Sequence, residues 1–92
     1  MSHRQAPDIA PQLIWRQLDG NVVIVLPRQG DIHVLNPIGT SIWQLLVERC
    51  SIADIERHLV THYDVSEADA RRDLAAFLAD LTERELLIGP VL

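Results

Sequence analysis

Two histidines stand at a spacing that could hold a metal ion. His58 and His62 are four residues apart, which would place both imidazoles on one side of a helix, as with two ligands of a zinc ion. The residues between them include no glutamate, which the zinc-hydrolase motif requires, and no cysteine partner is nearby. The pair is therefore interpreted as solvated surface histidines, and we expect neither a metal nor any other cofactor.

Acidic residues recur near the end of the chain at helical spacings, where two carboxylates could cooperate in acid–base catalysis. Arginines are interleaved with them, so they are interpreted as the solvated face of a helix. The sequence has no glycine-rich phosphate loop and no lysine, which excludes phosphate-loop and Schiff-base lysine chemistry. We therefore expect a protein that is not an enzyme. The acidic residues are Asp69, Asp73, Asp80 and Glu83, and their basic neighbours are Arg72 and Arg84.

Composition narrows the class of protein further. The net charge is −5, whereas a protein that binds double-stranded nucleic acid normally presents a basic face. The single cysteine, Cys50, excludes an internal disulfide and fits a reducing cytoplasm. No apolar run approaches the ~20 residues of a membrane helix, and no signal-peptide pattern is present. We expect a cytoplasmic protein without a nucleic-acid or membrane partner.

Three short apolar segments separated by turn signals predict a three-stranded antiparallel meander. The dipeptide Asp19-Gly20 between the first two segments is a strong hairpin signal, because both positions of a tight hairpin turn need positive φ. The expected strands cover residues 13–18, 21–26 and 31–35. We expect one domain over residues 1–92, with residues 1–11 as a flexible arm and residues 12–88 as the folded core.

The two turns also predict which residues lie opposite one another. Trp15 should face Ile24, and Ile24 should face His33, which is interpreted as a packed histidine rather than a catalytic base. Helices can cover only one face of such a sheet, so we expect residues 88–92 or a second copy of the chain to cover the other, with a homodimer favoured. The expected faces are Trp15, Val22, Ile24, His33 and Leu35 on one side, and Ile14, Val23, Val25, Ile32 and Val34 on the other.

Three capping signals predict three helices after the strands. Asn36 before Pro37 favours a helix over residues 37–48. Ser51 and Ser66 each stand three residues before an aspartate, a pattern similar to the capping box, and predict helices to His62 and to about Arg84. The order of elements predicts an α+β fold, a three-stranded antiparallel meander followed by three helices in a winged-helix-like arrangement.

The same segments, taken in order, resemble the PqqD-like domains, which are also called recognition elements of ribosomally made, post-translationally modified peptides. The resemblance extends from about Trp15 to Ile88. The segments that carry it are IHVLNP at residues 32–37, IWQLL at 42–46, SIADI at 51–55, YDVS at 63–66, and the apolar pairs at 77–78 and 86–87.

This resemblance implies a peptide-binding module rather than an enzyme. Members bind the leader of a precursor peptide and present it to a modifying enzyme. This enzyme is a radical enzyme in pyrroloquinoline quinone (PQQ) biosynthesis, and it can also be a cyclase or a protease. The resemblance implies that the leader adds as a further strand to the third strand, in a groove beside the third helix. An edge strand offers unpaired backbone groups for this mode of binding. The expected peptide-binding residues are Asp31, Ile32, His33, Val34, Leu35, Arg71, Ala75 and Leu78.

Two other functions remain as alternatives. One is a winged-helix DNA-binding regulator, which the net charge of −5 and an aspartate-rich third helix disfavour, because a recognition helix should be basic. The other is a purely structural dimerisation domain.

Overall fold

The computed structural model describes residues 8–26 and 30–88 of the chain. Within these residues, a three-stranded sheet is followed by three helices, and a second sheet of two strands joins the ends of the described segment. The predicted α+β order of strands and helices is confirmed. The elements are β1 (Asp8–Ile9), β2 (Ile14–Leu18), β3 (Asn21–Leu26), β4 (Asp31–Val34), α1 (Pro37–Val47), α2 (Ile52–His62), α3 (Glu67–Glu83) and β5 (Leu87–Ile88).

The sheet β2-β3-β4 is an antiparallel meander with the predicted register. Trp15 lies opposite Ile24, and Ile24 lies opposite His33. Asp19 and Gly20 both have positive φ, 53° and 85°, as the two-residue turn between right-twisted strands requires. The turn therefore sets the register, and the register decides which side chains face the helices.

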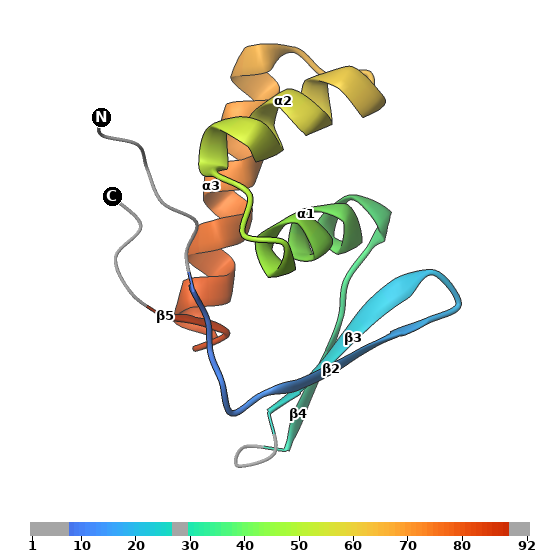
Figure 1. Ribbon diagram of the computed structural model, residues 1–92, viewed down its shortest axis with the longest axis vertical. Helices are drawn as coiled ribbons and strands as arrows, with labels where there is room; N and C mark the ends of the chain where they lie inside the picture. Colours follow the sequence, from blue (N-terminus) through green and yellow to red (C-terminus); the bar gives the residue numbers. More distant parts are fainter. Residues whose placement is uncertain (1–7, 27–29, 89–92) are drawn as a thin grey trace.

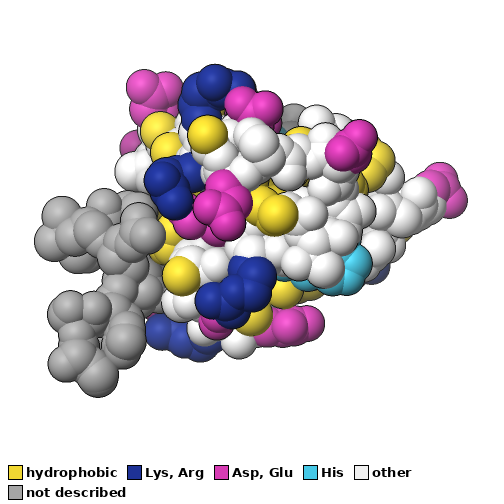
Figure 2. Space-filling view, turned by 90° about the horizontal axis from the view of Figure 1, so that it is seen from above, with side chains coloured by type: hydrophobic (Ala, Val, Ile, Leu, Met, Phe, Trp, Pro, Cys, Tyr) yellow, Lys and Arg dark blue, Asp and Glu magenta, His cyan; other side chains and the backbone are white. Residues whose placement is uncertain are grey.

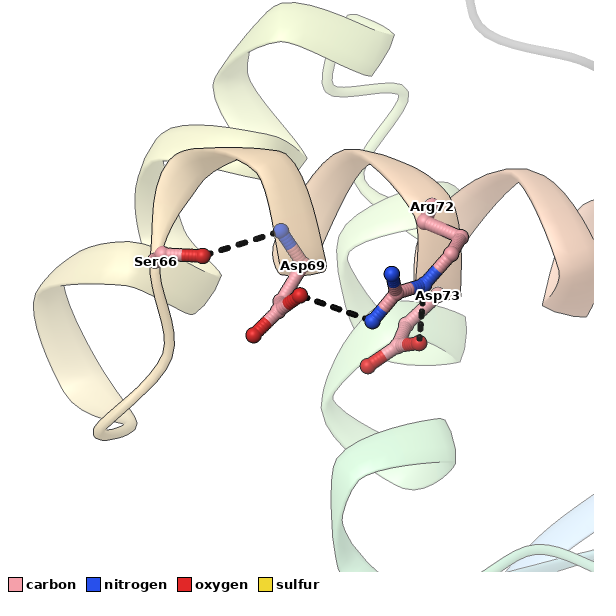
Figure 3. Close-up of polar contacts among 4 residues, drawn as sticks. All are labelled: Ser66, Asp69, Arg72 and Asp73. Carbon is pink, nitrogen blue, oxygen red and sulfur yellow. Dashed lines mark hydrogen bonds and ion pairs between the residues drawn. The ribbon is translucent and has the colours of Figure 1, made fainter.

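Each helix begins after the residue predicted to cap it. The Asn36 side chain accepts a hydrogen bond from the backbone N–H of Gly39 at 2.7 Å. The hydroxyls of Ser51 and Ser66 accept from the N–H three residues later, both at 3.1 Å. Figure 3 shows the bond at Ser66. These bonds satisfy N–H groups that have no partner within their helices.

The C-terminal end of α3 is closed by backbone hydrogen bonds around a residue in the left-handed conformation. Glu85 has φ of 65°, its N–H donates to the carbonyl of Thr82, and the N–H of Leu86 donates to the carbonyl of Leu81. This is the Schellman arrangement, in which glycine is the favoured residue at the left-handed position. Arg49, with φ of 64°, occupies the same position after α1.

The core lies between the sheet and the helices, which Figure 1 shows on one side of β2, β3 and β4. Val22 and Ile24 on β3 are fully buried, together with Trp43 on α1 and Leu74 on α3. Trp15 on β2 meets Trp43 edge-on, with ring centroids 6.2 Å apart. The predicted inner face of the sheet is therefore the face that meets the core.

The opposite, outer face of the sheet remains largely open within the described chain. Ile14, Ile32 and Val34 are 53%, 66% and 66% exposed, and Val23 and Val25 are half-buried. No described segment lies over these side chains. A cover by a second copy of the chain stays a prediction.

Of the flexible arm expected over residues 1–11, residues 1–7 lie outside the described residues, and the residues that follow have a defined structure. Asp8 and Ile9 form β1, which pairs antiparallel with β5 so that Asp8 lies opposite Ile88, and Ala10 is buried. Because β5 pairs with β1, it does not cover the outer face of the sheet; residues 89–92 of the expected cover lie outside the described residues. A two-residue strand has no periodicity to read in a sequence, so β1 was not predicted. None of the helices in the described ranges combines the length and apolar character needed to cross a bilayer.

Candidate functional site

The strand β4 is an edge of the three-stranded sheet. Within the described chain it pairs with β3 on one side, and no strand pairs with its other side. An unpaired edge presents backbone donors and acceptors that a further extended segment can use. We call this free side of Asp31–Val34 the β4 edge.

Hydrogen bonds at the end of β4 show which residues supply those groups. Leu35 donates its N–H to the carbonyl of Val22 at 2.9 Å. In an antiparallel pair, hydrogen-bonded and non-hydrogen-bonded positions alternate, so the backbone groups of His33 also point toward β3. The N–H and C=O groups of Ile32 and Val34 then point away from β3 and supply the β4 edge.

Side chains of β4 alternate in the same way between the two faces of the sheet. Ile32 and Val34 project onto the outer face, where they are exposed. His33 projects toward the helices and is half-buried. Its Nδ1 atom lies 3.2 Å from a terminal guanidinium nitrogen of Arg84. Because arginine is always a donor, His33 accepts this bond and, when neutral, carries its proton on Nε2, which is buried without a partner.

Arg84 follows α3 and is held from its own helix as well. Its Nε donates to Asp80 Oδ2 at 3.0 Å, in an exposed ion pair one helical turn apart. Asp80 and Arg84 thus mark the flank of α3 that lies beside β4. The same flank continues toward the start of the helix through Phe77 and Asp73, at helical spacings of three and four residues.

A mainly apolar cavity of about 240 Å³ opens where β4 leads into α1. Asn36, two residues after the end of β4, lines it together with Asp73 and Phe77 of α3. The Tyr63 hydroxyl, which also lines it, is 2.7 Å from the hydroxyl of Ser41. The cavity therefore lies among the three helices, and Asp73 and Phe77 place it on the same flank of α3 as Arg84.

The structure brings part of the predicted peptide-binding set together. Asp31, Ile32, His33 and Val34 form β4, whereas Leu35 follows the strand and is buried; a peptide contact at these residues stays a prediction. The predicted residues of α3 do not line up beside them: Arg71 lies 3.8 Å from Glu56 of α2, and Leu78 is 4% exposed in the core. Ala75, one turn after Arg71, is on the same exposed flank. A peptide contact at these three residues of α3 stays a prediction.

Sequence reasoning missed Arg84 as a neighbour of His33. The signal was present, since Asp80 and Arg84 stand four residues apart, but they were interpreted as part of a solvated face. Helical periodicity identifies the buried stripe of α3 without showing which flank meets which strand.

The histidine pair of α2 and the charged side chains of α3 contact their own neighbours along each helix. His58 and His62 stack with ring centroids 4.0 Å apart, and no group of three metal-binding side chains occurs within residues 8–26 and 30–88. Arg72 bridges Asp69 at 2.7 Å and Asp73 at 3.9 Å (Figure 3). On the face drawn in Figure 2, arginines alternate with acidic side chains and no basic patch forms.

Comparisons with known proteins identify the family of the chain. The chain is similar to two solved structures titled "TbiB1 in Complex with the TbiA(beta) Leader Peptide" and "Lasso peptide synthetase B1 complexed with the leader peptide". Each is 30% identical with a TM-score of 0.86; the alignments cover 90% and 91% of this chain, and 96% and 99% of the other. Among curated proteins, none matches the sequence. Residues 21–87 match the family model described as coenzyme PQQ synthesis protein D, so the chain belongs to the PqqD family.

Proposed function

We propose that the chain binds the leader of a ribosomally made precursor peptide by strand addition to β4 and presents it to a modifying enzyme. The observation that carries this proposal is the free β4 edge, with the backbone groups of Ile32 and Val34 directed away from β3. Backbone hydrogen bonds give affinity that tolerates different sequences, and neighbouring side chains give specificity. In this function the chain acts by binding and catalyses no reaction itself.

Two similarities support the proposal. The chain shares its family with a protein of PQQ synthesis, and the titles of both similar structures name a bound leader peptide. The cavity at the end of β4 adds a place for an apolar side chain of the peptide. A DNA-binding function has no comparable support, because the net charge is −5 and α3 carries acidic residues in its first turn.

The proposal includes two partners besides the leader. One is the enzyme that modifies the precursor, whether a radical enzyme, a cyclase or a protease, working with the chain in the cytoplasm. The other is a second copy of the chain, which would cover the aliphatic side chains of the outer face. The exposure of Ile14, Ile32 and Val34 supports an association of this kind.

Proline substitution at the β4 edge tests strand addition. Val34→Pro removes an N–H that points away from β3, so we expect the fluorescently labelled leader of a candidate precursor peptide to bind roughly tenfold more weakly. The fold should persist, because no bond between β3 and β4 uses that N–H. Fluorescence anisotropy gives the affinity, and circular dichroism checks the fold.

Gln17→Pro is the matched control. Leu18 and Asn21 flank the two-residue turn and form a pair, so alternation directs the N–H of Gln17 out of the opposite edge, β2. This variant loses an equivalent free N–H at an edge that the proposal does not use. Equal affinity of both folded variants, whether strong or weak, would contradict binding at β4.

A further inference from the structure

The position of Arg84 beside β4 has a consequence for the kind of peptide that the edge selects. The backbone groups of His33 bond to β3, so a residue of an added antiparallel strand that lies opposite His33 would form a non-hydrogen-bonded pair with it. Side chains of such pairs are close and project to the same face. The side chain of that peptide residue would therefore lie beside the His33 ring, on the helix side of the sheet.

Arg84 is already in place at this position. One of its terminal nitrogens contacts His33 at 3.2 Å, and its Nε is engaged by Asp80 at 3.0 Å. A guanidinium has five N–H donors, and the other terminal nitrogen of Arg84 makes no hydrogen bond with any described residue. Two protein contacts thus orient the group and leave donors for a ligand.

We infer that Arg84 reads a carboxylate side chain on the bound peptide, at the residue opposite His33. This inference rests on the proposed strand addition to β4. An aspartate or glutamate at that position would form a charge-assisted hydrogen bond with the free donors of Arg84, which is stronger than a bond to a neutral amide. Arg84 is then a specificity-determining residue of the peptide site.

The neighbouring charges determine at which peptide position a carboxylate is favoured. Asp31 lies two residues before His33 and projects to the same face of β4, so it disfavours an acidic peptide residue placed opposite itself. Asp80 binds the Nε of Arg84 and His33 contacts one terminal nitrogen, so the second terminal nitrogen is left to the ligand. A carboxylate is therefore favoured opposite His33 and disfavoured one step along the same face.

A selection that needs no known ligand tests the inference. A random peptide library displayed on phage is selected on the immobilised chain and, in parallel, on Arg84→Gln, Arg84→Glu and Arg72→Gln. Peptides selected by the wild type should share one position enriched in aspartate or glutamate. The enrichment should vanish with Arg84→Gln and change to lysine or arginine with Arg84→Glu. Arg72→Gln, which removes an arginine from another side of α3, should leave it unchanged.

Titration of one selected peptide and its Glu→Gln form gives the magnitude. The wild type should bind the glutamate form roughly five- to tenfold more tightly, a value discounted for the partial exposure of Arg84. Folded Arg84→Gln should bind both forms equally. A merely structural role of Arg84 would weaken both forms alike and leave their ratio unchanged, which would overturn the inference.

The outcomes distinguish a failure of the proposed function from a failure of the role inferred for Arg84. If the wild type selects no peptides, or if Val34→Pro leaves their binding unchanged, the proposed function fails. The proposed function stands and the role of Arg84 fails in three cases. Peptides bind at β4 without an enriched acidic position, they share a basic position instead, or their acidic preference persists with Arg84→Gln.

Discussion

The hydroxyl of Thr40, in the first turn of α1, accepts a hydrogen bond from the backbone N–H of Val22 in β3 at 3.0 Å. The same hydroxyl lies 3.4 Å from the carbonyl oxygen of Leu35, directly after β4. Thr40 is 4% exposed, so water does not replace these bonds. A single side chain thus attaches α1 to the central strand and to the end of the strand that carries the proposed site.

Thr40→Val should lower the free energy of unfolding by about 1–3 kcal/mol, because it leaves the buried N–H of Val22 without a partner. Urea denaturation followed by circular dichroism measures the change. Thr40→Ser keeps the hydroxyl and should retain most of the stability. Because Thr40→Val keeps the methyl group of threonine and removes only the hydroxyl, a Thr40→Val variant as stable as the wild type would contradict this role of the hydroxyl.

Glu85→Gly should be more stable than Glu85→Ala by about 0.5–1 kcal/mol, because residue 85 holds a left-handed conformation that costs an L-residue energy and glycine little. Thermal denaturation gives the shift in Tm. Glu85→Ala is the control, since it removes the side chain and keeps the backbone penalty. A gain with alanine as large as that with glycine would point to the side chain instead.

Val25→Arg tests association through the outer face of the sheet. Val25 lies opposite both Ile14 and Ile32, so a charge there should weaken a homodimer that buries this face. Sedimentation velocity at micromolar concentration should show a dimer for the wild type and a monomer for the variant. Ala76→Arg adds the same charge to an exposed position of α3 and should not dissociate it. A monomeric wild type would contradict the predicted homodimer through the outer face of the sheet.

Cys50 should react slowly with iodoacetamide near neutral pH. Burial raises the pKa of its thiol, and the negative charges of Glu48 and Asp54 raise it further. A raised pKa lowers the fraction of thiolate, which is the reacting form. The rate should be below that of a free cysteine peptide and should rise as the pH increases. Glu48→Gln should accelerate the reaction; a rate equal to that of the peptide would contradict the shift.

Arg71→Glu should change stability by no more than about 1 kcal/mol, because Arg71 is an exposed partner of Glu56 across α2 and α3. The predicted peptide contact at Arg71 implies that Arg71→Glu lowers leader affinity, whereas a residue that only pairs with Glu56 would leave the affinity unchanged. Anisotropy titration and thermal denaturation of the same preparation test both expectations. A loss of affinity without a loss of stability would extend the peptide site to the α2 side of α3.

The features of the fold that could be predicted from the sequence are those that a local sequence pattern determines. The register could be predicted because Asp19-Gly20 allows one tight turn, and that turn fixes every pair along β2 and β3. Helix starts could be predicted because Asn36, Ser51 and Ser66 are local caps. The contact between His33 and Arg84 joins residues 51 positions apart, and it depends on how α3 is rotated against the sheet. No local pattern contains that rotation.

The pairing of β1 with β5 places Asp8 opposite Ile88, so the first and last described strands are immediate neighbours (Figure 1). Neither strand belongs to the sheet that carries β4. Adjacent ends of this kind allow a domain to be inserted into a loop of a host polypeptide, or to be circularly permuted, with little strain. A permutant that joins residue 88 to residue 8 by a short linker, with new ends between β3 and β4, would keep both edges of the meander in their present surroundings.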